Sequence, residues 1–209
     1  MNFDPLARAY RWLEWLSFGR ALEQRRFAYL PQCAQATRLL LLGEGDGRFL
    51  AQLLHANPQA QVEVIDASHQ MLAQAKNQLP PLPANVAFHH ANALSFPLPS
   101  AHYDCLVTHF FLDCFSQTDA ERLIEGAAQS LRPGGLWVLS EFSTTGAGAW
   151  WKAPLVRLMY AFFRLTCGLT TQRIPRYHAA LERSGLTLRA QQIAWAGLLR
   201  SELWQKNSN

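Results

Sequence analysis

Residues 39–50 read LLLLGEGDGRFL, in which four leucines precede three alternating glycines and a helical pattern. Consecutive leucines are apolar on both faces of a strand, which is typical of a central strand in a sheet covered on both sides. Glycines allow a tight turn and a close approach between ligand and backbone amides at the helix start. The spacing is G-x-G-x-G, and it departs from the dinucleotide pattern G-x-G-x-x-G because position 48 is Arg. The stretch predicts a strand, a ligand-binding turn and a helix.

From Thr37 onward, short β-like runs alternate with helical stretches, which predicts a parallel sheet with helices on its faces. The expected strands are 38–42, 61–65, 86–90, 103–109, 135–142, 187–194 and 198–204. The expected helices are 5–16, 19–30 ended by Pro31, 48–55, 68–78, 118–131, 150–165 and 175–184. Ser116 to Asp119 offer side-chain caps to the helix at 118–131.

The composition predicts one globular domain with a cover of different character. The chain has 209 residues, of which 49% are apolar and 16% charged, so disordered, collagen-like and coiled-coil architectures are excluded. Residues 37–142 carry 5 basic and 10 acidic side chains, whereas 1–36 and 143–209 together carry 14 and 5. Six of the seven tryptophans also lie in these flanks. The flanks are either helices that pack on the core or a binding surface.

Targeting signals and metal sites are not apparent in the sequence. The N-terminus lacks the pattern of a signal peptide, and no apolar run approaches the roughly 18 to 20 residues of a membrane span, so we expect a cytoplasmic protein. Four cysteines without paired spacing are expected to be reduced thiols. His89 and His90 are adjacent on a strand and point to opposite faces, so no metal site is expected.

Asp66 ends the expected second strand, 19 residues after Gly47. A carboxylate at such a strand tip can accept hydrogen bonds from both hydroxyls of a ribose. The alternative is a plain helix cap, and the glycine turn at this spacing favours the ribose contact.

Residues 37–142 resemble the class I S-adenosylmethionine-dependent methyltransferases. The resemblance rests on the glycine turn, Asp66, the step Ala91-Asn92-Ala93, Tyr103-Asp104 and the run from Leu131 to Gly135. The pattern from Asp66 to Leu72 is similar to the small-molecule branch that includes the ubiquinone and menaquinone biosynthesis methyltransferases. The implied fold is α/β, a Rossmann-like, seven-stranded, mostly parallel sheet with helices on both faces and a helical cap. We expect a single domain over 1–209, with a cap at 1–36, a cofactor-binding core at 37–142, and a cap helix and C-terminal strands at 143–209.

The resemblance implies S-adenosylmethionine as cofactor and S-adenosylhomocysteine as product. Gly43 to Gly45 would face the methionine part of the cofactor, and Asp66 would hold the ribose. The adenine would lie between Ala67 and Met71, with Asn92 and Ala93 along its edge. The expected cofactor-binding residues are Gly43, Glu44, Gly45, Asp66, Ala67, Met71, Asn92, Ala93 and Thr108.

Two positions depart from the family pattern. Asn92 replaces an acid at the adenine edge, although its amide oxygen can still accept from an amino group. Leu41 replaces an acid near the cofactor's ammonium group. Glu44 or Asp46 could supply that charge from the turn, and the alternative for both is favourable electrostatics at a helix start.

The catalytic residues are expected beyond the carboxyl ends of the first and fourth strands, where the strand order switches. Thr108, His109, Phe110, Phe111 and Asp113 are expected at the mouth of this pocket. His109 could take a proton from the acceptor or only pack in a loop. The remaining candidates are Glu141, whose alternative is a strand-end acid with a backbone or Arg partner, and Tyr10, whose alternative is a core or lid aromatic. The expected catalytic set is His109, Asp113, Glu141 and Tyr10.

The stretch 150–165 is strongly apolar, and Arg157 and Arg164 are seven apart on one helical face. Such a helix lies at a membrane surface or lines the entrance for a hydrophobic substrate, and the alternative is a cap helix buried against the sheet or at a dimer contact. In each case the substrate pocket beneath it is expected to be hydrophobic. Residues 108–112 read THFFL, unlike the motif of methyltransferases that modify base amino groups, which disfavours nucleic acid substrates. We expect methyl transfer to oxygen or carbon of a hydrophobic lipid, quinol or polyketide-like molecule. The alternatives are an inactive cofactor-binding regulatory or scaffold protein and a nicotinamide-dependent oxidoreductase. A peripheral membrane contact and a homo-oligomer stay open.

Overall fold

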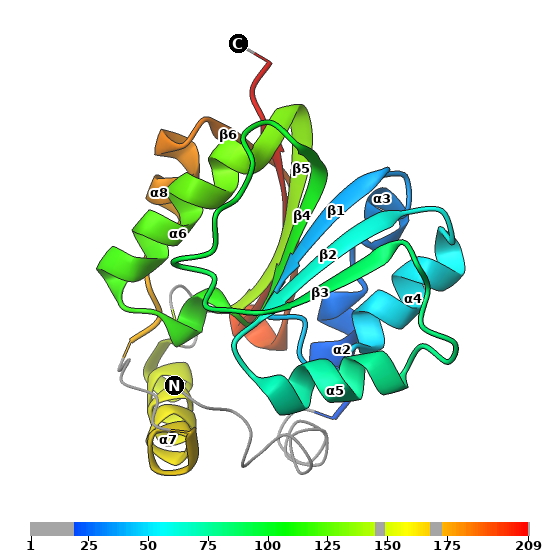
Figure 1. Cartoon of the computed structure of the whole chain (residues 1–209). Helices are drawn as coiled ribbons and strands as arrows, with labels where there is room; N and C mark the ends of the chain where they lie inside the picture. Colours follow the sequence, from blue (N-terminus) through cyan, green and yellow to red (C-terminus); the bar gives the residue numbers. More distant parts are fainter. Residues whose placement is uncertain (1–18, 145–148, 168–172, 209) are drawn as a thin grey trace.

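A computed structural model describes residues 19–144, 149–167 and 173–208. Its strands are β1 Arg38–Leu42, β2 Gln61–Asp66, β3 Val86–His90, β4 Tyr103–His109, β5 Leu131–Phe142, β6 Leu186–Ala194 and β7 Leu199–Lys206. They form one seven-stranded sheet in the order β3-β2-β1-β4-β5-β7-β6 (Figure 1). Neighbours from β3 to β5 pair in parallel, and β7 is antiparallel to both β5 and β6. The predicted mostly parallel, Rossmann-like sheet is confirmed.

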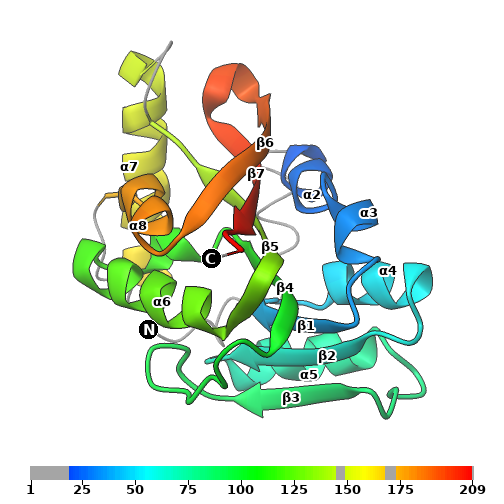
Figure 2. The same cartoon turned by 90° about the horizontal axis from the view of Figure 1, so that it is seen from above.

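Helices cover both faces of this sheet (Figure 2). They are α2 Ala21–Arg26, α3 Leu30–Cys33, α4 Arg48–Ala56, α5 His69–Asn77, α6 Gln117–Ser130, α7 Ala149–Cys167 and α8 His178–Arg183, with short 3-10 turns η2 Leu112–Cys114 and η3 Trp195–Gly197. The side of α3, α4 and α5 packs on Leu39 and Leu41, and the side of α6 and α8 packs on Leu40 and Leu42. All four leucines of β1 are almost fully buried, and each such side chain stabilises the fold by about 1.5–3 kcal/mol.

Side-chain caps fix where two of these helices begin. The Ser116 hydroxyl accepts the backbone N–H of Asp119 at 3.1 Å, so the expected cap of α6 is confirmed. The Ser68 hydroxyl accepts the N–H of Met71 at 3.2 Å and starts α5 in the same way. Ser68 lies two residues after the end of β2, so this cap sets the direction in which the chain leaves Asp66.

The structure corrects several predicted boundaries. Pro31 does not end a helix but lies in the first turn of α3, because a proline there has no intrahelical N–H bond to lose. The predicted helix 19–30 is therefore divided into α2 and α3. Strand β5 begins at Leu131, four residues before the predicted start, since Leu131 already pairs with Tyr103 ahead of an irregularity in the register. The helix expected at 5–16 lies outside the described residues.

Helix α7 lies beyond the carboxyl edge of the sheet (Figure 1). Its buried residues Val156 and Tyr160 pack with Leu22 of α2, Phe142 at the end of β5, and Leu198. It thereby caps the edge where functional residues were predicted. Among the helices described, none combines the length and the apolar character needed to cross a bilayer.

Gly47 offers a test of the turn that joins β1 to α4. Its φ is +84°, and a Cβ there would lie 2.5 Å from the Cα of Ala75 in α5. We expect Gly47→Ala to lower the free energy of unfolding by about 2–5 kcal/mol, since a left-handed alanine is strained and the helix backbone must shift. Urea denaturation measures the change. The matched control is Gly126→Ala in α6, where nothing lies within 4 Å and a gain of up to about 1 kcal/mol is expected. Equal stabilities of the two variants would contradict the left-handed conformation of Gly47 and its close contact with Ala75.

Candidate active site

The glycine turn after β1 is shaped on one side by a phenyl ring and open on the other. Gly43 has a φ of +66°, and the ring of Phe111 occupies the space that a Cβ would need. Gly45 has a φ of +73°, and no described atom lies within 4 Å of its Cβ position. A ligand can therefore approach the backbone at Gly45, whereas Gly43 is required for contact with the segment after β4.

Asp66 connects the tip of β2 to this turn. Its Oδ2 accepts the backbone N–H of Gly45 at 3.3 Å, and its Oδ1 accepts that of Ser68 at 2.8 Å. Both contacts use one lone pair of an oxygen that can accept more than one hydrogen bond. The carboxylate is thus fixed in place between the tip of β2 and the glycine turn.

A cavity of about 280 Å³ lies over the turn at the carboxyl edge of β1, β2 and β4. The predicted cofactor residues that line it are Gly43, Glu44, Gly45, Asp66, Ala67, Met71, Asn92 and Ala93. The Asn92 Oδ1 accepts the N–H of Leu94 at 3.0 Å, which holds the short turn after β3 in shape. The structure therefore brings eight of the nine expected residues to one cavity, and their roles toward a cofactor stay predictions.

Thr108 is the exception, and its expected position at the pocket mouth is wrong. Its side chain is fully buried, and its hydroxyl accepts the indole N–H of Trp137 at 3.0 Å. Neighbouring residues on a strand point to opposite faces of the sheet. Thr108 therefore lies on the face where it meets the Trp137 side chain, and His109 lies on the other face, against Phe49, where it lines the cavity.

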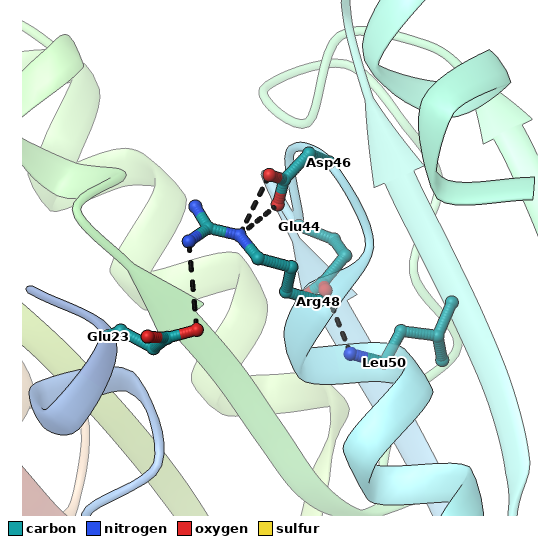
Figure 3. Close-up of polar contacts among 5 residues, drawn as sticks. All are labelled: Glu23, Glu44, Asp46, Arg48 and Leu50. Carbon is teal, nitrogen blue, oxygen red and sulfur yellow. Dashed lines mark hydrogen bonds and ion pairs between the residues drawn. The ribbon is translucent and has the colours of Figure 1, made fainter. Parts of the chain in front are cut away.

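The two acids of the turn are engaged with the start of α4 (Figure 3). The Nε of Arg48 donates to the Asp46 carboxylate, with distances of 2.8 and 3.0 Å to its two oxygens. The Glu44 Oε1 accepts the N–H of Leu50 at 2.8 Å. Burial raises the pKa of Glu44 to about 8, opposed by this hydrogen bond and by the charge of Arg26. Both acids thus contact residues at the start of α4, and a ligand ammonium near Glu44 would favour its ionised form.

His109 is the titratable residue of β4 that faces the cavity. Its side chain is 8% exposed, and its ring lies edge-on to Phe49 with centroids 4.8 Å apart. Neither ring nitrogen has a hydrogen-bond partner among the described residues. Burial, with a smaller contribution from Arg26, lowers the pKa of His109 to about 3. The imidazole is therefore neutral at physiological pH and has a nitrogen lone pair available.

Glu141 and Asp113 hold the loop after β4 and do not line the cavity. The Glu141 Oε1 accepts the N–H groups of Phe111 at 3.1 Å and Leu112 at 2.8 Å, which positions the phenyl ring at Gly43. Burial raises the pKa of Glu141, and it raises that of Asp113 to about 6. The prediction that Asp113 lies at the pocket mouth is thus wrong, since its side chain is buried within η2. Tyr10 lies outside the described residues.

Arg26 is a cavity residue that the sequence did not indicate. It is buried in the last turn of α2, and its guanidinium carbon lies 5.6 Å from the ring centroid of Phe110. The backbone of Phe110 has a φ of +52°, a strained value that turns the chain at the end of β4. The basic flank was the sole signal in the sequence, and it did not distinguish Arg26 from its neighbours.

Metal chemistry has no visible support in this part of the molecule. Within the described ranges, no group of three or more His, Cys, Asp or Glu side chains is placed to hold a metal ion.

The raised pKa of Glu44 predicts a pH dependence of stability. An acid with a pKa near 4.5 unfolded and about 8 folded makes folding less favourable as pH rises between these values, because the unfolded chain ionises first. We expect the free energy of unfolding of Glu44→Gln to fall less between pH 5 and pH 8.5 than that of the wild type. Urea denaturation at several pH values measures this difference. The exposed Glu125→Gln is the control, and identical pH curves for Glu44→Gln and wild type would contradict the burial of this carboxyl.

Comparisons with known proteins identify the family of the chain. Residues 39–135 match the family model described as a methyltransferase domain. A demethylmenaquinone methyltransferase of Thermus thermophilus is 32% identical over 149 residues, which are 70% of this chain and 67% of that protein. The ubiquinone/menaquinone biosynthesis C-methyltransferase UbiE of Pasteurella multocida is 30% identical over 134 residues, or 61% of this chain. The chain spans 48% of the length of that relative, which is about half.

A solved structure supports the same fold over most of the chain. An S-adenosylmethionine-dependent methyltransferase from Mesorhizobium loti superposes with a TM-score of 0.68, covering 89% of this chain and 100% of that one at 17% identity. At this identity the similarity is evidence for the fold, and the sequence match with the Thermus protein carries the family. Glycine turn, strand-end carboxylate, strand order and sequence similarity together show that the chain belongs to the class I S-adenosylmethionine-dependent methyltransferases.

Proposed function

We propose that this protein transfers a methyl group from S-adenosylmethionine to a carbon or oxygen atom of a hydrophobic small molecule. The observation that carries the proposal is a buried, neutral His109 whose ring nitrogens have no described partner, at the wall of the cavity above the glycine turn. The names of the Thermus and Pasteurella relatives supply the class of acceptor, a quinol-like ring. A cytoplasmic location, a peripheral membrane contact and self-association stay proposals.

The residues of the cavity fit the proposed cofactor. Gly45 leaves its backbone open, and Asp66 is a fixed carboxylate at the cavity wall. Met71, Ala67 and Ala93 add apolar surface suited to an adenine ring. When bound, S-adenosylmethionine supplies a methyl group already activated by the positive sulfur. The main tasks of the protein are then alignment and exclusion of water.

The acceptor side of the cavity is aromatic. Phe110, Phe111 and Phe115 line it beyond the glycine turn, and the rings of Phe111 and Phe115 meet edge-to-face at 5.0 Å. Glu141 holds the backbone of this segment, so we assign it a positioning role. His109 is the proposed base for a hydroxyl or an acidic C–H of the acceptor.

The alternatives are distinguished by cofactor and turnover. Family membership removes the support for a nicotinamide-dependent oxidoreductase. An inactive cofactor-binding protein would bind S-adenosylhomocysteine but transfer no methyl group. Methyl-labelled S-adenosylmethionine with a set of short-chain quinols and lipophilic phenols tests this point. Label extracted into organic solvent is the expected result, and its absence with every acceptor in the set would contradict the proposal.

Asp66 provides the test of the cofactor contact. We expect Asp66→Ala to weaken S-adenosylhomocysteine binding by about tenfold, equivalent to about 1.4 kcal/mol, since hydrogen bonds to the ribose are lost. Calorimetric titration measures the dissociation constant. Glu63→Ala is the matched control, because Glu63 lies on the same strand but outside the cavity and pairs with His89 at 3.4 Å. Equal affinity of both variants would count against the ribose contact.

His109 provides the test of the proposed base. His109→Phe keeps a ring against Phe49 but removes both nitrogens, so kcat should fall by about 10²–10⁴ while S-adenosylhomocysteine affinity changes little. The wild-type rate should show no inflection near pH 6.5 from this group, because its pKa is lowered to about 3. His55→Gln, on the exposed side of α4, should leave kcat unchanged. An unchanged kcat in His109→Phe would assign the histidine to packing.

A further inference from the structure

A second and larger cavity, of about 780 Å³, lies between α7, α8 and the adjoining ends of β5 and β7. Its floor is apolar and aromatic, formed by the buried side chains of Phe142, Val156, Tyr160 and Tyr177. The hydroxyl of Tyr160 donates to the backbone carbonyl of Asp113 at 3.3 Å, so this floor adjoins the loop that positions the candidate active site.

Five arginines line the same cavity, and no Asp or Glu is among its described lining residues. Arg157 and Arg164 come from α7, Arg200 from β7, and the remaining two from the segment before α8. These two are Arg173 and Arg176. All but Arg200 are exposed, so the guanidinium groups form a rim around an apolar floor.

This rim is not neutralised by the described part of the protein. Arg157, Arg164, Arg173 and Arg176 make no ion pair there, whereas Arg132 and Arg183 elsewhere pair with carboxylates at 2.6 and 3.4 Å. The carboxylate behind the cavity wall, Glu202, is fully buried and accepts from His178 at 2.8 Å. The Glu202 carboxylate also accepts hydrogen bonds from the side chains of Gln191 and Trp204, and among the described residues it makes no ion pair with the four exposed arginines of the rim. The rim therefore stays strongly cationic.

We propose that this cavity binds an amphipathic anion, a molecule with an apolar body and a carboxylate or phosphate group. The apolar body lies on the aromatic floor, and the anionic group binds between guanidinium forks, whose planar geometry matches both oxyanions. The inference rests on the proposed function in one respect, since it makes the methyl acceptor a hydrophobic molecule that carries an acidic group. Binding itself requires no methyl transfer.

Calorimetric titration with decyl phosphate tests the cavity, and decanol and inorganic phosphate serve as probes that lack one half of the amphiphile. We expect saturable binding of decyl phosphate that the double variant Arg157→Gln/Arg176→Gln weakens by tenfold or more. The matched control Arg122→Gln/Arg189→Gln removes the same charge from exposed sites outside the cavity and should bind within twofold of the wild type. Arg157→Lys/Arg176→Lys keeps the charge but loses the forks, so an intermediate affinity is expected. Equal weakening in both glutamine variants would overturn the proposal.

An experiment with lipid vesicles distinguishes a free anion from a lipid headgroup as the ligand. Co-sedimentation with phosphatidylglycerol and with phosphatidylcholine vesicles compares anionic and neutral headgroups. Binding of decyl phosphate without vesicle binding supports a free ligand, whereas binding to phosphatidylglycerol alone, lost in Arg157→Gln/Arg176→Gln, supports the same anion chemistry on a lipid headgroup. Absence of binding in both arms overturns the inference.

Failure of this inference differs from failure of the proposed function. S-adenosylhomocysteine titrates into the other cavity and should bind the arginine variants and the wild type equally. Arginine-dependent decyl phosphate binding without label transfer to any acceptor would keep the anion site and contradict the methyl transfer. Label transfer to neutral acceptors, without binding of decyl phosphate or of anionic vesicles, would support the methyl transfer and contradict the anion site.

Discussion

The burial of β1 on both faces is the constraint on which the rest of the molecule depends. Leu39 and Leu41 pack into one core and Leu40 and Leu42 into the other, so this strand cannot shift by one residue without exchanging both sets. Its register with β2 and β4 is fixed as a result. The glycine turn, the end of β2 and the end of β4 then meet at the point where the strand order switches, which is the position where open α/β sheets bind ligands.

Burial also sets the charge of the site. The pKa of Glu44 is raised to about 8, that of Asp113 is raised to about 6 and that of His109 is lowered to about 3, each with burial as the largest cause. All three shifts favour the neutral form of the side chain. Arg26 adds a positive charge that disfavours protonation of His109. His109 is therefore neutral at physiological pH, and the burial that lowers its pKa also makes it a weaker proton acceptor than a solvent-exposed histidine.

The parts that sequence predicted well are those in which local pattern and fold agree. Four leucines followed by alternating glycines specify both a buried strand and its turn, and Asp66 lies where a strand-end carboxylate was expected. The failures arise where tertiary packing decides. Thr108 and His109 are adjacent on β4 and point to opposite faces of the sheet, so they cannot both lie at the pocket mouth. Asp113 does not reach the pocket mouth either, because its side chain is buried in η2. Arg26 reaches the cavity from a helix far away in sequence, which no local motif records.

The acidic middle and the basic C-terminal flank of the sequence line two different cavities of the fold. The acidic middle of the chain holds the turn and strand ends that fit a nucleoside, whereas all five arginines of the larger cavity belong to the basic C-terminal flank. The family model ends at residue 135, so these arginines lie outside it. The cavity over the glycine turn is thus lined mostly by residues within that model, whereas the larger cavity is lined by residues beyond it. The chemistry of a ligand for the larger cavity therefore has to be inferred from its guanidinium groups and aromatic rings rather than from the names of relatives.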